Sequence, residues 1–474
     1  MWAVMIRVET ILWKGYDCGA ILKATCGKDE IMTSSSLTQP FPIRRVIKTW
    51  WPLAASWLLM SVEIPALSAV MARLANPEIN LAAYGGIVFP LSLIVETPII
   101  MLLSASTALC KDWATYKKLY WFMMFSAAFL TLLHILIAFS PIYYFVARTL
   151  LGVPEAVVES GRLGLMLMTP WTWSIAYRRF HQGILIRFGY SDAVGLGTVV
   201  RLTGGGIILV AGFLVGSIQG VVVGAVAQAV GVVSEAVFIG LRVRPVLNFE
   251  LKHAPAGEPL KWKSFANFYV PLAMTSFLGL LWQPLGSAAL SRMQDPLTSL
   301  AVWPVAAGLV TLFRSAGFAM NEVVVALLDR VGSYVSLRRF TFWLAAILTL
   351  LQVVALVTPA AMFWFAGVSA LPQNLANLAW NAFWLAVPMA ALTVFQSWFQ
   401  GAILYGRQTR AIPEATAVFV SVFLGFAIIG IVLGNATGLY VNMVAFVAAN
   451  LAQMGWLWLR SRQTLRMIQR RDVA

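Results

Sequence analysis

The sequence predicts an all-α polytopic membrane protein with 12 transmembrane helices, arranged as two parallel six-helix repeats. Three observations lead to this fold class. The 474 residues are 60% hydrophobic and only 11% charged, whereas soluble globular proteins carry about 25% charged residues. Apolar runs that reach the roughly 20 helical residues needed to cross a bilayer occur twelve times. Landmark residues of the first half also return in the second half at a nearly constant spacing.

The internal repeat is carried by prolines, glycines and one arginine. In the first run the spacing is 219 residues: Pro52 recurs as Pro271, Pro65 as Pro284, Arg73 as Arg292 and Pro77 as Pro296. Beyond residue 140 the spacing is 218: Pro141 recurs as Pro359, Pro170 as Pro388, Gly183 as Gly401 and Gly216 as Gly434. Such residues recurring in register indicate one backbone built twice. We interpret the change in spacing as one residue lost from the first half between positions 83 and 140.

The predicted spans are apolar on every face, which argues against alternating membrane strands. Pro and Gly within them are tolerated in spanning helices. The spans are expected near residues 49–72, 81–109, 119–147, 160–178, 194–215, 220–241, 266–290, 299–328, 340–366, 375–398, 412–433 and 438–459.

Basic residues concentrate in every second connection and in the tail. They include Arg44, Arg45, Lys48, Lys111, Lys117, Lys118, Arg178, Arg179, Arg187, Arg242, Arg244, Arg330, Arg338, Arg339, Arg407 and Arg410. Basic loops stay cytoplasmic, so both termini are predicted on the cytoplasmic side of the plasma or inner membrane. The same distribution explains the net charge of +15 without a nucleic-acid partner. Because each half has an even number of spans, the repeats are parallel rather than inverted.

The chain is accordingly divided into five parts. These are an N-terminal cytoplasmic extension (1–43), a first lobe (44–241), a cytoplasmic linker (242–263), a second lobe (264–459) and a basic cytoplasmic tail (460–474). The 3 cysteines and 3 histidines are too scattered for a disulfide framework or a metal site. The sequence also shows no nucleotide motif and no hydrolytic set of residues. We therefore expect a monomeric transporter of a small molecule in the lipid bilayer, with no enzyme activity and no cofactor beyond a coupling ion.

Charged residues inside the spans are the candidate site, because each costs about 2.5–3.5 kcal/mol or more at the centre of a membrane helix. Glu63 and Glu96 lie midway along the first and second spans, each two residues before a proline (Pro65 and Pro98) that frees a backbone carbonyl. A carboxylate beside such backbone is suited to bind H⁺ or Na⁺. The alternative is a carboxylate that is permanently protonated or paired with a neighbouring helix.

Arg314 lies midway along the eighth span; its counterpart in the first half is Glu96 at the 218 spacing, or Val95 at the 219 spacing. We hypothesise an ion pair between Glu96 and Arg314 across the lobes, which breaks when the transporter opens or an anion arrives. Asn321 and Glu322 continue the polar face, unless they form a structural pair. Arg201 is a further candidate. Glu235 and His134 are further candidates. Glu235 and Arg201 both lie close enough to the cytoplasmic face for their side chains to snorkel to it. A histidine placed like His134 is more often a hydrogen-bonded core residue than a proton relay.

Several short stretches resemble the multidrug/oligosaccharidyl-lipid/polysaccharide (MOP) flippase superfamily, and within it the progressive ankylosis family. They are Arg73-Leu74 with Pro77-Glu78 and Leu81–Gly85, His134–Ser140 with Tyr143-Tyr144, Gly183–Arg187 with Tyr190-Ser191, and Arg338–Phe342 with Thr358-Pro359. The resemblance covers residues 44 to about 460. It implies a V-shaped, MATE-like transporter of two lobes that exports its substrate by alternating access.

The ankylosis family is associated with efflux of small anions, which Arg201 and Arg314 would suit. The multidrug branch uses an Asp in the first helix for cation coupling. The aligned position here is Leu67, and Glu63 lies one turn earlier on a similar face. Two other transport functions stay open, a lipid-linked oligosaccharide flippase and an H⁺- or Na⁺-coupled multidrug antiporter. A non-transporting membrane scaffold or receptor is the alternative from another class.

Overall fold

A computed structural model describes residues 41–255, 259–328, 330–406, 408 and 410–473. The predicted extension at residues 1–43 lies almost entirely outside this part of the chain. The described residues are helical almost throughout and contain no strand, only one isolated bridge between Gln294 and Thr437.

The first half of the chain supplies one lobe, with two π-helices among its helices. Its elements are α2 (Ile43–Ser61), α3 (Glu63–Met71), α4 (Pro77–Ala83), η2 (Tyr84–Val88), α5 (Phe89–Ile100), α6 (Leu102–Leu109), α7 (Trp113–Phe139), α8 (Ile142–Tyr144), η3 (Phe145–Leu151), α9 (Glu155–Leu167), α10 (Thr169–Arg187), α11 (Ser191–Val215) and α12 (Gly220–Pro245), followed by η4 (Val246–Leu251).

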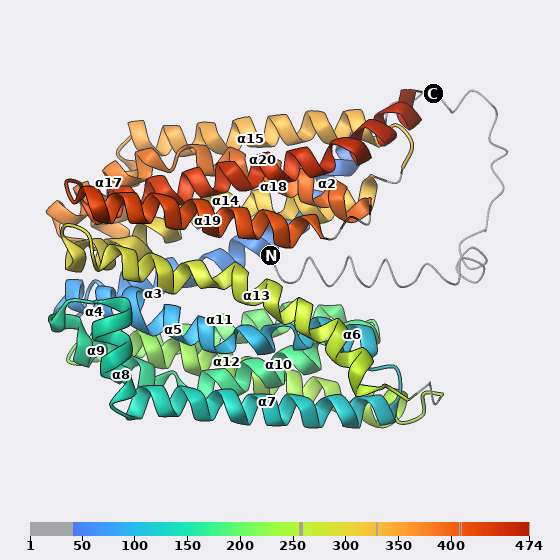
Figure 1. Cartoon of the computed structure of the whole chain (residues 1–474), viewed down its shortest axis with the longest axis horizontal. Coiled ribbons are helices and arrows are strands. Elements are labelled where there is room, and N and C mark those ends of the chain that lie inside the picture. Colours follow the sequence, from blue (N-terminus) through green and yellow to red (C-terminus); the bar gives the residue numbers. More distant parts are fainter. Residues whose placement is uncertain (1–40, 256–258, 329, 407, 409, 474) are drawn as a thin grey trace.

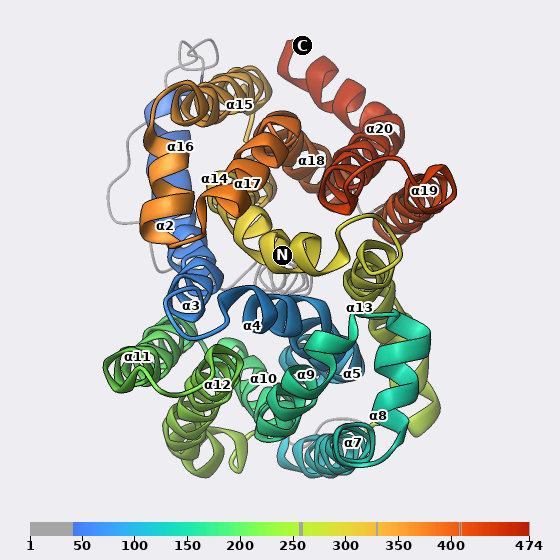
Figure 2. The same cartoon turned by 90° about the vertical axis from the view of Figure 1, so that its left-hand side faces the viewer.

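The second half repeats this order in the other lobe. Its elements are α13 (Trp262–Leu290), α14 (Pro296–Leu327), α15 (Ser333–Val357), α16 (Ala360–Met362), η5 (Phe363–Val368), α17 (Gln373–Leu385), α18 (Pro388–Tyr405), α19 (Ala411–Leu433) and α20 (Gly438–Val473). Figures 1 and 2 show two helical bundles: most helices coloured blue to green form one, and most helices coloured yellow to red form the other.

Within the described residues, nine helices are long and apolar enough to cross a membrane, and the bent pair α17–α18 would make a tenth. The remaining two predicted spans correspond to α9–α10, which carries several arginines, and to α20. A multi-pass all-helical membrane protein is confirmed, whereas the count of twelve stays a prediction.

Backbone dihedrals confirm the duplication residue by residue. Left-handed residues lie at the boundaries of equivalent elements in the two halves, at the spacings found in the sequence. The pairs are Asn76 (φ 50°) with Asp295 (φ 52°), Gly152 (φ 67°) with Ala370 (φ 49°), and Gly216 (φ 68°) with Gly434 (φ 63°). Three of these six residues, Asn76, Asp295 and Ala370, are left-handed without being glycine, so the fold requires that turn in both halves.

The π-helix η2 accounts for the change in spacing. A π-turn holds one residue more than an α-turn, and the second half has no π-turn there, since α14 runs unbroken from Pro296 to Leu327. The first half therefore carries an extra residue, and our interpretation of a lost residue was wrong. A Cβ on Gly85 would come within 2.8 Å of Pro304 in α14, so the bulge lies at a close contact between the lobes.

The first helix of each half crosses to the opposite lobe. Figure 1 shows α13 running from one lobe to the other. In the same way, α2 packs against α14 and α15 of the second half. The crossing contacts obey the repeat: Trp50 donates its indole N–H to the Ala316 carbonyl (3.0 Å), and Tyr269, its counterpart, donates to the Pro98 carbonyl (2.5 Å). Pro65 lacks the N–H that would continue α2, and the helix breaks at Val62, next to Glu63.

Helices extend into both the predicted linker and the predicted tail. The helical run of α12 and η4 reaches Leu251, and α13 begins at Trp262 within the predicted linker. The tail continues α20 as far as Val473. We call the end of the molecule where α2 begins and α20 ends the basic end, and the opposite end, around α4, α8 and α17, the distal end.

Candidate functional site

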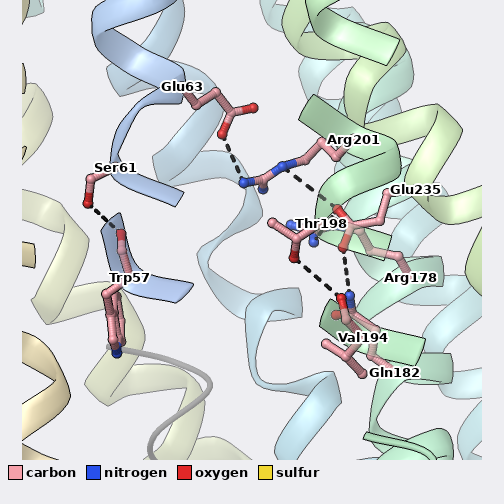
Figure 3. Close-up of polar contacts among 9 residues, drawn as sticks. All are labelled: Trp57, Ser61, Glu63, Arg178, Gln182, Val194, Thr198, Arg201 and Glu235. Carbon is pink, nitrogen blue, oxygen red and sulfur yellow. Dashed lines mark hydrogen bonds and ion pairs between the residues drawn. The ribbon is translucent and has the colours of Figure 1, made fainter. Parts of the chain in front are cut away.

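The first lobe contains a chain of ion pairs that begins at the break in its first helix. Glu63 Oε2 lies 2.9 Å from Arg201 Nη2 of α11, and Arg201 Nε lies 3.9 Å from Glu235 Oε2 of α12. Figure 3 shows Arg201 reaching between the two carboxylates. The Glu63 and Arg201 side chains are 19% and 11% exposed. Arg201 and Glu235 therefore form a structural ion-pair chain rather than snorkelling separately to the surface.

α10 supplies the buried end of this chain. Arg178 Nη1 lies 2.7 Å from Glu235 Oε2, and the Gln182 amide donates to Glu235 Oε1 at 2.8 Å (Figure 3). The Arg178 and Glu235 side chains are 5% and 1% exposed. A buried carboxylate held by two donors and a second cation has its charge compensated within the lobe.

Arg178 and Arg179 were predicted in a basic cytoplasmic connection, and the structure corrects this placement. Both lie inside α10, nine and eight residues before its end at Arg187, or about 12–13 Å at 1.5 Å per residue. The polar stretch around them resembles a loop in composition. The signal that could have identified it as a buried helix face is the spacing of four between Arg178 and Gln182, which places both on one side of a helix.

Glu96 lies on α5, in the same lobe and close to these arginines. Its side chain is buried at 4% exposure, and the charges of Arg178, Arg179 and Arg201 act on it. Around it, several buried polar atoms have no hydrogen-bond partner within the described residues. They are Glu96 Oε2, Arg178 Nε, Arg179 Nε, Gln182 Oε1 and Arg201 Nε. Unpaired buried polar atoms in such number indicate a site that holds water or a small ion.

Arg314 occupies the equivalent position on α14 in the second lobe. It is buried at 9% exposure. Its Nε donates to Thr393 Oγ1 at 2.6 Å and its Nη2 to Asn450 Oδ1 at 3.3 Å. The guanidinium also lies 5.3 Å from the ring centroids of Phe318 and Phe446. Arg314 makes no ion pair with a described carboxylate, so the hypothesised pair with Glu96 is not formed in this structure.

Apart from Arg314, the second lobe replaces the ionic chain with neutral groups. At the 218 or 219 spacing the counterparts are Trp282 for Glu63, Phe419 for Arg201, Gln453 for Glu235 and Gln396 for Arg178. The contacts recur although the chemistry differs: Trp282 and Phe419 pack with ring centroids 6.1 Å apart, and Gln396 donates to Gln453 Oε1 at 3.4 Å. One lobe is thus ionic and the other aromatic and amide-lined, with Arg314 as its buried cation among the described residues.

The other candidates divide between the two lobes. Asn321 and Glu322 are partly buried on α14, about two turns beyond Arg314, and Asn321 Oδ1 has no partner within the described residues. His134 bonds Thr172 Oγ1 at 2.9 Å and the Leu165 carbonyl at 3.0 Å, so it is a hydrogen-bonded core residue, as expected. Among the described residues, no group of three or more His, Cys, Asp or Glu side chains is arranged to hold a metal ion.

Two arginines join the lobes at the distal end, and they are repeat counterparts. Arg73 donates to the carbonyls of Val368 (2.5 Å) and Gly367 (2.6 Å) at the end of η5. Arg292 donates to the carbonyls of Thr149, Leu150 and Leu151 at the end of η3, each at 2.8 Å. We call these two sets of contacts the arginine clasps.

A cation at the C-terminal end of a helix is favoured by the orphan carbonyls there. The Thr298 hydroxyl of α14 adds a bond to Glu78 Oε1 at 2.7 Å between the same lobes. The distal end is therefore held closed in this structure by polar contacts.

A family model of the progressive ankylosis protein (ANKH) matches residues 31–244 of the chain. No curated protein sequence matches it significantly.

Solved structures match over most of their length. A multidrug resistance MATE family transporter of the MOP superfamily, in an inward-facing conformation, has a TM-score of 0.64 at 15% identity and covers 86% of this chain and 96% of its own. The lipid II flippase MurJ, in an inward closed conformation, has a TM-score of 0.63 at 12% identity, covering 88% and 91%.

A third similar structure is a MOP superfamily transporter from Pyrococcus furiosus, described as having a binding pocket of reverse polarity that suggests a different function. Its TM-score is 0.60 at 14% identity, and it covers 93% of this chain and 100% of its own. The chain has the fold of these transporters, and the resemblance found in the sequence is confirmed.

Proposed function

We propose that the protein is a secondary transporter that exports a small anionic solute by alternating access. The observation that carries the proposal is Arg314, a buried guanidinium that has no carboxylate partner among the described residues. Keeping an unpaired charge at the centre of a membrane helix costs about 2.5–3.5 kcal/mol or more. Only two of its five N–H donors have hydrogen-bond partners within the described residues, so donors are left for a carboxylate or a phosphate.

The ionic chain of the first lobe is the proposed coupling site. Arg201 is shared between Glu63, at 2.9 Å, and Glu235, at 3.9 Å. Protonation or Na⁺ binding at Glu63 would release Arg201 towards Glu235, which changes the charge presented between the lobes. Glu96, with its unpaired oxygen, is the second candidate for a coupling ion.

Alternating access requires contacts that close one end and can break. The arginine clasps at the distal end are suited to this, because both are made to backbone carbonyls of the opposite lobe. We place the basic end in the cytoplasm, so breaking the clasps would release the solute outside. The protein is proposed to act as a monomer in the plasma or inner membrane.

The second candidate is a lipid-linked oligosaccharide flippase, favoured by the similarity in fold to MurJ. A flippase must let a lipid tail remain in the bilayer while its headgroup crosses between the lobes. Similarity to a multidrug MATE transporter favours a third candidate, a cation-coupled drug antiporter.

Reconstitution in vesicles distinguishes the three candidates. Protein would be tested with an H⁺ or Na⁺ gradient for flux of pyrophosphate, citrate or a cationic dye, and separately for translocation of a fluorescent lipid-linked sugar. We expect gradient-driven anion flux that is lost in Arg314→Gln and partly kept in Arg314→Lys, which preserves the charge but not the fork.

Arg148→Gln is the matched control, because it removes an exposed arginine that pairs with Glu155 within one lobe. Anion flux that survives Arg314→Gln contradicts the proposal. Dye flux lost in Glu63→Gln would favour the antiporter, and lipid translocation without anion flux would favour the flippase.

A further inference from the structure

A groove on the outer face of the second lobe lies between α15, α18 and α20 near the basic end. Its volume is about 290 Å³, and aromatic side chains from all three helices line it. They are Tyr334, Phe342, Phe395, Trp398, Phe399 and Trp458. Phe342 is 53% and Trp458 44% exposed in the isolated chain. The groove therefore opens towards lipid rather than towards the other lobe.

Arginines are held against the aromatic wall of this groove. Arg338 lines it and lies 5.9 Å from the centroid of Phe342, and Arg462 lies 4.3 Å from the centroid of Trp458. A second hollow of about 540 Å³ shares Arg338 and Phe342 and adds Arg339. None of the three arginines makes an ion pair within the described part of the chain.

The first lobe repeats this groove between α10 and α12, with a volume of about 340 Å³. Two of its lining residues, Tyr177 and Gly240, correspond at the 218 spacing to Phe395 and Trp458 of the second groove. Arg244, which also lines it, corresponds to Arg462, the arginine that lies against Trp458. An arginine thus stands at the equivalent place in both lobes although the residue beneath it changes from glycine to tryptophan. Orientation of a membrane protein needs basic residues near this end, but it does not require a cation at one fixed position beside a groove.

We propose that the groove between α15, α18 and α20 binds a phospholipid with an anionic headgroup. The phosphate lies among Arg338, Arg339 and Arg462, and an acyl chain lies over Phe342, Phe395 and Trp458. Basic pockets between membrane helices on the cytoplasmic side suit such headgroups. The aromatic lining favours a lipid over a soluble anion, because it offers apolar area that a free phosphate would not cover. The lipid acts at a site separate from Arg314 and from the ionic chain.

The test is native mass spectrometry of the full chain titrated with phosphatidylglycerol or with phosphatidylcholine of the same acyl chains. About 1 kcal/mol per arginine, or about 3 kcal/mol for the three, gives an expected preference for phosphatidylglycerol of about 100- to 150-fold. The triple variant R338Q/R339Q/R462Q is expected to reduce this preference to within about twofold. The matched control R44Q/R466Q/R470Q removes three exposed arginines that lie outside the groove and is expected to keep the preference.

Equal affinity for the two lipids, or an equal loss in the control, would overturn the proposal. So would displacement of the lipid by glycerophosphoglycerol, the same headgroup without acyl chains, since that would identify a site for soluble anions. If the triple variant does not fold, R462Q compared with R466Q carries the test, with an expected fivefold loss, which corresponds to about 1 kcal/mol.

Discussion

Replacing both clasp arginines should open the distal end. Arg73 and Arg292 together donate five hydrogen bonds to backbone carbonyls of the opposite lobe, two from Arg73 and three from Arg292. Both arginines are exposed, so each bond is assigned about 0.5 kcal/mol, the low end for a net hydrogen bond. Their sum is about 2.5 kcal/mol, which shifts a closed–open equilibrium about 50- to 100-fold towards the open state.

The assay is a distance measurement between spin labels on the two lobes. Ile142 and Ala360 are exposed repeat counterparts at the distal end, and Ile142→Cys with Ala360→Cys reports their separation once the native cysteines are replaced. We expect a longer distance to become populated in Arg73→Gln/Arg292→Gln. Arg292→Lys alone should have an intermediate effect, because one ammonium cannot bond three carbonyls at once.

Arg148→Gln is the control for losing an arginine at the same end, because its partner Glu155 is in the same lobe. Its distance distribution should match that of the unmodified chain. If the double variant also leaves the distribution unchanged, the clasps do not contribute to closing the distal end, and the reasoning above is refuted. A variant that instead unfolds would show a broad distribution of distances rather than a second defined distance.

Three further changes follow from the packing and the charges. Gly183→Ala places a Cβ 2.0 Å from Ser106 Oγ and should cost about 1–3 kcal/mol of stability, seen as a lower Tm in detergent; Gly195→Ala, with nothing within 4 Å, should not lower it. Glu235→Gln leaves the buried guanidinium of Arg178 without its carboxylate and should lower the free energy of unfolding by about 3–5 kcal/mol. Glu63→Gln changes the partly exposed end of the same series of ion pairs and should lower it much less in the same thermal assay. The Arg148 guanidinium holds the pKa of Glu155 below its ordinary value, so the contribution of this pair is present at neutral pH and lost as pH falls through that lowered pKa; Glu155→Gln should remove this acid dependence from the melting profile.

The duplication was predictable because prolines and left-handed turns constrain the backbone wherever they occur. Arg73 and Arg292 were recognised as repeat counterparts, but nothing in the sequence says that each reaches across to the other lobe. That contact depends on how the lobes are docked. The π-helix η2 was visible only as a one-residue change in spacing. The fall from 219 to 218 shows that the first half is longer by one residue, but not that a π-turn holds it.

The sequence identified charged residues of the candidate site but not which of them form ion pairs. Glu63 and Arg201 belong to one ion-pair chain, yet three predicted spans lie between them in the sequence and no periodicity connects them. Arg178 was assigned to a connection because a polar helix face that is buried against another helix resembles a loop in composition. Burial of such a residue is decided by a partner on a different helix, here Glu235 at 2.7 Å.

The two lobes have diverged in chemistry while keeping the same contacts. Where the first lobe has Arg178 against Glu235, the second has Gln396 against Gln453, and the pair still touches. Since the carboxylates of the first lobe are paired with arginines, a cation that binds there has to displace an arginine, as we propose for Glu63. The second lobe, with amides and rings, leaves Arg314 as its buried cation at that depth. This asymmetry favours a coupling ion bound in the first lobe and an anion bound in the second lobe. The two sites would then be coupled through the movement of the lobes rather than by direct contact.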